Sequence, residues 1–321
     1  MSLRPKIVKL ARMIGGLPGM LNKIDENAPE YYSMAGVVTD DQADVALAAG
    51  LRKVRTVEEL AQRCGKPLEE TRRLAHELAD IGIFMLWTDR EDGKEKVIVE
   101  IFAPGVLERM VNNREQLAAH PEIGRAFNAY TGGTGGKMAS MFPMGANLMR
   151  VIPVESAIEG NPQTVEYEKI SYYLDKFDKF SVSDCSCRAS RRIMGEGCGH
   201  LETDMCLHLG PAAEYYADTG KARYVTKEEA LEIIKRAEDN GLMHSMPNID
   251  VPGESGALCN CCACSCFGLR IGLMFGARDA VRSNYVAEVD EEKCVACGQC
   301  VEVCPGNALK LGQKLCTKEE L

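Results

Sequence analysis

Hydrophobic and polar positions in the first hundred residues follow helical spacing and later alternate, which predicts several short helices followed by a hairpin. Residues 4–14 place Ile7, Leu10 and Ile14 on one side and basic residues on the other. We therefore expect an amphipathic helix that packs on its own protein rather than on a membrane or a partner. Residues 41–49 predict a second short helix.

A capping box marks the start of a further helix, because Thr56 is followed three residues later by Glu59. The apolar stripe of this helix includes Cys64, which we expect to be a buried small hydrophobic residue rather than a ligand. A tight turn then leads into a third helix, whose predicted buried residues are Leu74, Leu78 and Ile81.

Two strand-like runs, residues 84–88 and 96–102, follow these helices. Three short helices followed by a hairpin is the order of a winged helix-turn-helix domain. Arg72 and Arg73 would lie on its third helix, but four acidic residues share that helix and would repel phosphate. We therefore expect a packing or homodimerisation role for this domain rather than DNA binding.

A later helix begins near residue 226, because Thr226 and Glu229 form a capping box and Gly241 supplies a stop. It separates two groups of cysteines and is predicted to be a spacer between them. The residues predicted to line its buried face are Leu231, Ile234 and Ala237.

Cysteine usage is the strongest chemical signal in the chain. Of the 15 cysteines in 321 residues, 14 lie between Cys185 and Cys316. No stretch is long and apolar enough to span a bilayer and no secretory segment is evident, so we expect a cytoplasmic protein without a transmembrane segment. In the reducing cytoplasm, thiols are not kept as structural disulfides, so a high density of cysteine indicates metal or redox chemistry.

The net charge of the chain is −9, which does not favour non-specific binding to nucleic acid.

The C-terminal cysteines have the spacing C-x2-C-x2-C-x3-C-P of bacterial ferredoxins, whereas zinc would favour two C-x2-C pairs. In ferredoxins with two clusters, the fourth cysteine of such a run binds the other cluster. The fourth ligand could then come from an upstream cysteine, from Cys316, or from a partner half outside this chain. The run consists of Cys294, Cys297, Cys300 and Cys304, followed by Pro305.

Two further cysteine groups lie upstream. The later group has five thiols in eight residues, and its C-x2-C spacings are compatible with cluster binding or with a redox-active dithiol. The earlier group has four thiols within 22 residues, enough for one tetrahedral zinc ion or one cubane. His200 or His208 could replace a thiolate, but a histidine beside cysteines is more often a hydrogen-bond donor to sulfur or a structural residue. Arg188 could donate to a cluster sulfide or form a surface ion pair. The two groups are Cys259, Cys261, Cys262, Cys264 and Cys266, and Cys185, Cys187, Cys198 and Cys206.

At four ligands each, these cysteines suffice for two or three 4Fe-4S clusters. The predicted fold class is α+β and mainly helical. We expect an N-terminal helical arm (1–37), a winged-helix-like domain (38–105), a connecting segment (106–180), a cysteine-rich iron–sulfur domain (181–283) and a ferredoxin-like 4Fe-4S segment (284–321).

The order of the motifs resembles that of 4Fe-4S binding proteins of anaerobes with an N-terminal winged-helix-like segment. In some relatives a similar unit is fused to, or works with, a flavin-dependent NAD(P)H oxidoreductase. The resemblance implies electron transfer and a redox protein partner, which could be such a flavoenzyme. The motifs that carry it are DCSCR, GCGHLETDMC, a TKEEA helix ending in GLMH, CNCCACSC and CVACGQCVEVCP.

The leading hypothesis is an iron–sulfur electron carrier, a subunit or domain that relays single electrons between a low-potential donor and a partner oxidoreductase. One alternative is a terminal reductase, in which a cluster with an open coordination site binds substrate. Another is a regulator, in which the winged helix reads DNA and the clusters sense redox state. A cluster held by only three thiolates in an accessible pocket would favour the terminal reductase. Packing of the third helix against the rest of the chain would argue against the DNA-reading regulator.

Overall fold

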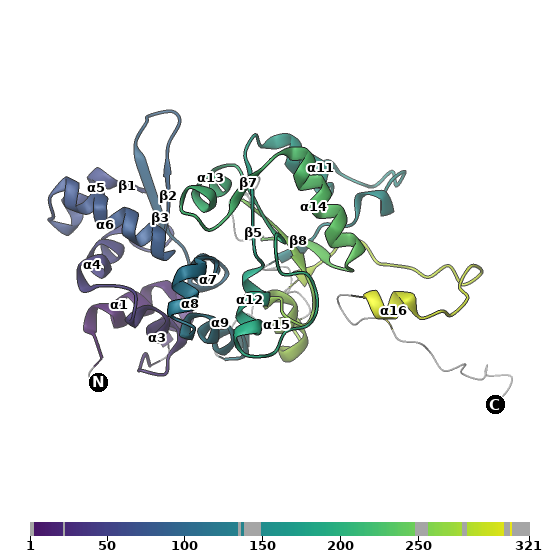
Figure 1. Ribbon diagram of the computed structural model, residues 1–321, viewed down its shortest axis with the longest axis horizontal. Helices are drawn as coiled ribbons and strands as arrows, with labels where there is room; N and C mark the ends of the chain where they lie inside the picture. Colours follow the sequence, from purple (N-terminus) through teal and green to yellow (C-terminus); the bar gives the residue numbers. More distant parts are fainter. Residues whose placement is uncertain are drawn as a thin grey trace.

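The computed structural model describes residues 3–21, 23–133, 136–137, 149–247, 256–277, 281–304 and 309. Over these ranges the chain is a mixed α/β protein with two β-sheets. Figure 1 shows the helices of the first half at one end, the larger sheet in the middle and the C-terminal segment at the other end. None of the helices in this part of the chain is long and apolar enough to cross a membrane.

The N-terminal half is built from short helices around a common hydrophobic core. The predicted amphipathic helix is α1(Pro5–Ile14), and it packs on α3(Pro29–Ala35) and α4(Asp40–Ala49) of its own chain. The other elements are α2(Gly16–Leu21), α5(Val57–Cys64), α6(Leu68–Ile81), the irregular turn η1(Phe102–Val106), α7(Leu107–Asn112), α8(Arg114–Ala119) and α9(Glu122–Gly132).

Two predicted helix starts have the expected capping chemistry. The hydroxyl of Thr56 accepts a hydrogen bond from the Glu59 amide at 3.2 Å, and the Glu59 carboxylate accepts one from the Thr56 amide at 3.0 Å. Thr226 likewise accepts from the amide of Glu229 at 3.2 Å. Each bond satisfies a backbone donor that has no partner within its helix.

A small antiparallel sheet follows α6. The predicted hairpin is present as β2(Phe84–Thr88) and β3(Glu95–Val99), and β1(Arg55–Thr56) pairs with the other edge of β3. The second strand was predicted to reach Phe102, but the chain leaves the sheet after Val99 and Phe102 begins η1. The interpretation of these elements as a winged helix stays a prediction.

Cys64 lies at the end of α5 and packs against the hydrophobic core, but it is half-buried rather than buried as predicted. Cys64 is the last residue of the helix and is followed by the exposed turn at Gly65, which leaves its side chain partly accessible. Its Sγ lies 3.8 Å from the carbonyl oxygen of Ala61 and 3.8 Å from the hydroxyl of Thr71. Its other neighbours belong to the hydrophobic core.

A seven-stranded sheet, absent from the sequence-based expectation of a mainly helical fold, forms the centre of the molecule. Its strand order is β10-β4-β8-β9-β6-β5-β7, and every pair except β10–β4 is antiparallel. The strands are short and several carry cysteine or polar residues, so they lack a clear apolar alternation. They are β4(Met149–Val151), β5(Phe180–Ser183), β6(Cys206–Leu209), β7(Arg223–Val225), β8(Met243–Pro247), β9(Ala257–Cys261) and β10(Val281–Arg282).

The spacer helix is α14(Lys227–Asp239), and it packs on one side of this sheet. The predicted Ile234 and Ala237 are buried, together with Ala230 and Ile233, whereas Leu231, also predicted to be buried, is 45% exposed. The prediction is therefore wrong only for Leu231. The remaining elements are η2(Glu155–Ala157), η3(Glu166–Glu168), α11(Ile170–Lys176), α12(Ser186–Ile193), α13(Pro211–Asp218) and α15(Phe267–Phe275).

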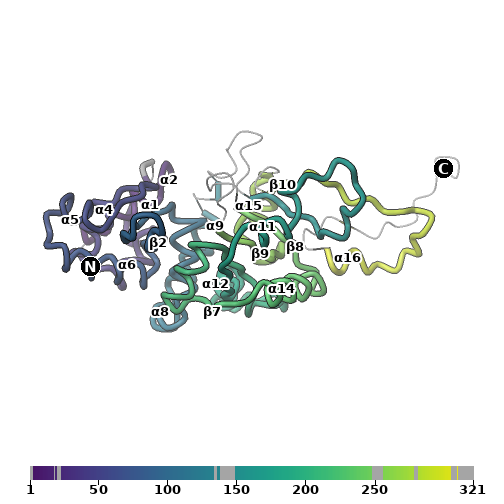
Figure 2. Tube along the Cα trace, turned by 90° about the horizontal axis from the view of Figure 1, so that it is seen from above, coloured from purple at the N-terminus to yellow at the C-terminus, as the bar shows by residue number. Residues whose placement is uncertain are grey.

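The C-terminal segment leads away from the central sheet, as Figure 2 shows, and contains α16(Gln299–Val303). Near its start the Asn284 amide donates to the Glu168 carboxylate at 2.5 Å, and the Tyr285 hydroxyl donates to the Thr164 hydroxyl at 3.2 Å. Beyond these contacts the segment exposes most of its side chains, including Val295 at 83%.

Candidate metal centre

Strand pairing brings cysteines of the two upstream groups together. Cys206 on β6 lies directly opposite Cys259 on β9, so their side chains share one face of the sheet. Cys261 lies two residues further along β9 and points to the same face. Leu207 and Leu258, the next opposed pair, point the other way into the core beneath α14. The antiparallel register therefore places three thiols on one face.

Three further thiols approach this face from the starts of two helices. Cys185 immediately precedes α12, Cys187 lies in the first turn of that helix, and Cys266 immediately precedes α15. Hydrogen bonds connect each of the six thiols with at least one other. We call this set the thiol chain, which runs in the order Cys185, Cys187, Cys266, Cys261, Cys259 and Cys206.

Hydrogen bonds decide which members of the thiol chain ionise. Cys187 donates to Cys185 and, together with the positive charge of Arg188, lowers the pKa of Cys185 to about 7. The Cys187 proton is shared between Cys185 and Cys266, and Cys187 and Cys261, with amides of the first turn of α15, hold the pKa of Cys266 well below its usual range. The pKa values of the donors Cys187 and Cys261 are raised, because their protons are held in these bonds. The thiolate, which is the metal-binding form, is thus favoured at two positions.

Arg188 lies buried between the thiols. Its Nη2 donates to the Asn260 carbonyl oxygen at 2.8 Å, and its charge acts on Cys185 and Cys262. Its Nε and Nη1 are buried without an oxygen or nitrogen acceptor among the residues described, and the side-chain partner of the guanidinium is the sulfur of Cys262. Buried donors without acceptors are costly. The donor set of thiols and guanidinium N–H groups therefore fits an iron–sulfur cluster, whose sulfides accept hydrogen bonds.

His208 follows Cys206 by two residues on β6 and faces the same side of the sheet. Its ring stacks on that of Tyr216, with centroids 3.6 Å apart, and its Nε2 lies 2.9 Å from the hydroxyl of Ser183. Burial lowers its pKa to about 3, so the ring is neutral at pH 7. These contacts fix the ring in place.

A second, more compact set lies beside the thiol chain. The sulfur atoms of Cys198 and Cys262 are 3.9 Å apart, and the sulfur of Cys264 is 4.0 Å from Nδ1 of His200. All four ligand atoms lie within 4.8 Å of one another. In the described ranges this is the one set of three or more cysteine, histidine or acidic ligand atoms gathered so closely. We call it the Cys3His group.

The structure therefore divides both upstream sequence groups between two sites. Cys198 separates from its three sequence neighbours, and Cys262 and Cys264 separate from the other members of CNCCACSC. The reason is local: β9 ends at Cys261, and Cys262 packs in the core on the α14 side of the sheet. Asn260 and Ser265, which contact these sites, were not predicted, because isolated polar residues carry no spacing signal.

The C-terminal cysteines lie at the surface. Cys294, Cys297 and Cys300 are exposed and Cys304 is half-buried. Positive φ angles at Ala296 (53°) and Gly298 (80°) bend the loop that carries them. Within the described residues they do not form a set as compact as the Cys3His group. Pro305 and Cys316 lie outside the described residues.

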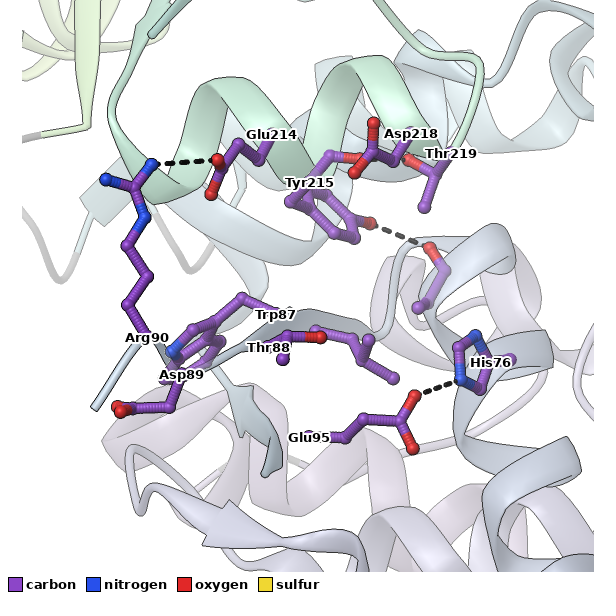
Figure 3. A pocket seen from close by; sticks show the side chains of 12 residues that line it. His76, Trp87, Thr88, Asp89, Arg90, Glu95, Glu214, Tyr215, Asp218 and Thr219 are labelled. Atoms are coloured by element: carbon purple, nitrogen blue, oxygen red, sulfur yellow. Dashed lines mark hydrogen bonds and ion pairs between the residues drawn. The ribbon is translucent and has the colours of Figure 1, made fainter. Parts of the chain in front are cut away.

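A pocket of about 520 Å³ with both polar and apolar walls lies between β2 and α13, and Figure 3 shows the side chains that line it. Its lining contains no cysteine. Arg90 pairs with Glu214 at 3.0 Å across the pocket, and the Tyr215 hydroxyl donates to the carbonyl oxygen of Ala79 at 2.7 Å. These contacts join α13 to the N-terminal half of the chain.

Comparison with known proteins identifies the C-terminal segment. A 4Fe-4S binding domain family matches residues 287–310, which contain the ferredoxin-type run. No curated protein and no solved structure matches the chain. The family match and the cysteine-rich region support at least one 4Fe-4S cluster and a general role in iron–sulfur electron transfer.

Proposed function

We propose that this chain is an iron–sulfur electron-transfer protein, or such a subunit of an oxidoreductase, with a buried 4Fe-4S cluster at the thiol chain in addition to the C-terminal one. The observation that carries the proposal is the thiol chain itself, in which six thiols from two sequence groups meet beside a buried arginine. Without a ligand, so many adjacent thiols would be an oxidation hazard. A bound cluster supplies reversible one-electron transfer.

Four of the six thiols would bind the buried cluster. Cys185 and Cys266 are the strongest candidates, because their pKa values are lowered and they would lose protons most readily. Arg188 would direct N–H groups of its Nε and Nη1 at the cluster sulfur atoms and offset part of the negative charge of the thiolates. Positive charge at this position favours the reduced state of the cluster.

The C-terminal segment would exchange electrons with a partner, since its cysteines are exposed. The residues before Cys294 are rich in acidic side chains, and an acidic surface suits docking on a basic patch. By its resemblance to the anaerobe proteins, the partner would be a flavin-dependent NAD(P)H oxidoreductase. The exposed acidic residues are Glu288, Asp290, Glu291 and Glu292.

The contacts of α6 do not favour the DNA-reading alternative. Arg72 pairs with Glu69 at 2.6 Å and with Glu95 at 2.8 Å, and Arg73 pairs with Glu77 at 2.5 Å. Both arginines of this helix are therefore neutralised by neighbouring carboxylates and are poor partners for phosphate. A packing role for the winged-helix-like segment fits these contacts better.

Anaerobic purification of the full chain, with iron and acid-labile sulfide analysis and EPR of the reduced protein, tests the proposal. We expect about eight iron atoms per chain, four for each of the two clusters, and a matching amount of sulfide. A double variant, C294S/C297S, should lose about four iron atoms and keep the remainder. If iron and sulfide disappear entirely from this variant, no cluster is held by the thiol chain and the proposal is wrong.

A further inference from the structure

We propose that the Cys3His group binds a single zinc ion, separate from the iron–sulfur clusters. Cys198 and His200 come from the segment between α12 and β6, and Cys262 and Cys264 come from the turn between β9 and α15. Three cysteine sulfurs and one histidine nitrogen are a frequent ligand set of structural zinc sites. The group thus has the number and type of ligands that one zinc ion requires.

The distances between the ligand atoms fit one ion. A tetrahedral ion with Zn–S bonds of about 2.3 Å holds its sulfur ligands about 3.8 Å apart. The sulfur atoms of Cys198 and Cys262 are 3.9 Å apart, and the sulfur of Cys264 is 4.0 Å from Nδ1 of His200. No pair among the four atoms exceeds 4.8 Å. The side chains therefore need only small adjustments to coordinate zinc.

A cubane would need a wider site. Each of its four ligands binds a different iron atom, so the ligand atoms stand apart around the whole cluster rather than around one ion. A set within 4.8 Å would have to open to admit four irons and four sulfides. The spacing of the Cys3His group therefore distinguishes it from a cluster site.

The surroundings of the group support ligation. Ser265 donates its hydroxyl hydrogen to the sulfur of Cys198 at 3.5 Å, a bond that orients the ligand. Zinc with three thiolates carries one net negative charge, and the buried guanidinium of Arg188 lies close to Cys262 to offset it. On binding, the three thiols release their protons, His200 coordinates as the neutral ring, and no electron is transferred.

The expected role of the ion is structural. Residues 194–205, which contain Cys198 and His200, form no helix or strand. Cys262 and Cys264 lie in the turn between β9 and α15, and this turn is flanked by Cys261 and Cys266 of the thiol chain. Zinc would tie that turn to the preceding loop. It would thereby stabilise this part of the chain without taking part in electron transfer, while β9 and the start of α15 hold Cys261 and Cys266 independently of the ion.

Metal analysis of the anaerobically purified full chain tests this proposal. We expect about one zinc per chain besides the iron, with zinc X-ray absorption indicating three sulfur ligands at about 2.3 Å and one nitrogen at about 2.0 Å. C264S should weaken zinc retention against a chelator by at least about tenfold, because its ligand is removed, and should leave iron and sulfide unchanged. C64S, which alters a cysteine outside both sites, should leave zinc and iron unchanged.

A second variant covers the case in which C264S does not fold. H200C keeps four ligands and should retain about one zinc, now with four sulfur neighbours in the absorption spectrum. Absence of zinc from the wild-type chain would overturn the proposal, as would loss of iron and sulfide instead of zinc in C264S. Because iron and sulfide are counted in the same samples, failure of the zinc site can be told apart from failure of the iron–sulfur function.

Discussion

Cys206 on β6 and Cys259 on β9 are directly opposed across an antiparallel strand pair, although they belong to separate cysteine motifs. A shift of this register by one residue would turn Cys259 and Cys261 to the other face of the sheet. The sheet therefore decides which thiols meet, and the cysteine motifs only supply them. The thiol chain consequently depends on correct folding of the central sheet.

Removing a central member of the thiol chain should remove the buried cluster. Cys187 lies between Cys185 and Cys266, the two strongest ligand candidates, and we therefore expect it to be a third ligand of the buried cluster. We expect C187S to lose about four iron atoms per chain with the matching sulfide, measured on anaerobically purified protein. C64S is the matched control and should keep its full iron content. Equal iron in C187S and the wild type would show that Cys187 is no ligand.

The charge of Arg188 should raise the reduction potential of the buried cluster. In R188M the positive charge is absent, so adding an electron becomes less favourable by roughly 1–3 kcal/mol at an effective dielectric constant near 20. For a one-electron couple this corresponds to a potential lower by about 40–130 mV, measured by redox titration followed by EPR. R188K keeps the charge and should lie closer to the wild type. A potential that is the same in R188M and R188K would mean that the charge has no such role.

Much of the N-terminal half follows from its sequence. Capping boxes and apolar stripes are local, so α5, α6 and the hairpin could be located from residues that lie close together in the chain. On α14 the predicted Ile234 and Ala237 are buried, but Leu231 is apolar and yet faces solvent. Local signals therefore located elements more reliably than they oriented them.

The central sheet and its ligand pairing could not be predicted in the same way. Strand pairs such as β6–β9 join distant segments, and strands that carry thiols show no clear apolar alternation. Cysteine spacing suggested that neighbours in sequence share a metal. The end of β9 at Cys261 instead separates Cys262 from its neighbours, and only the fold contains this information.

Acidic residues near the C-terminal cysteines should speed docking to a basic partner. E291Q/E292Q removes two exposed charges close to Cys294. At low salt we expect reduction by a flavin-dependent NAD(P)H–ferredoxin oxidoreductase to slow several-fold, with a weaker salt dependence, because electrostatic steering is reduced. Stopped-flow kinetics over a range of ionic strength measures the effect. The control E115Q removes an exposed charge from α8, which is far in sequence from the C-terminal cysteines, and should be reduced at the wild-type rate. If E115Q and E291Q/E292Q slow reduction equally, docking does not depend specifically on Glu291 and Glu292.

Lys221 should make the protein more stable as the pH rises above neutrality. Its ammonium is buried where it donates to the carbonyl oxygen of Ala79 at 3.0 Å, and burial lowers its pKa to about 7 from 10.5. Between these values the unfolded chain holds the proton and the folded chain releases it, so the free energy of unfolding increases with pH. From pH 7 to 9 the gain should be about 2 kcal/mol. In K221M this gain should be absent, whereas K9M, which alters an exposed lysine, should retain it. Anaerobic urea unfolding followed by circular dichroism measures the free energy of unfolding at each pH. If this free energy rises equally with pH in K221M and in the wild type, the assignment to Lys221 is wrong.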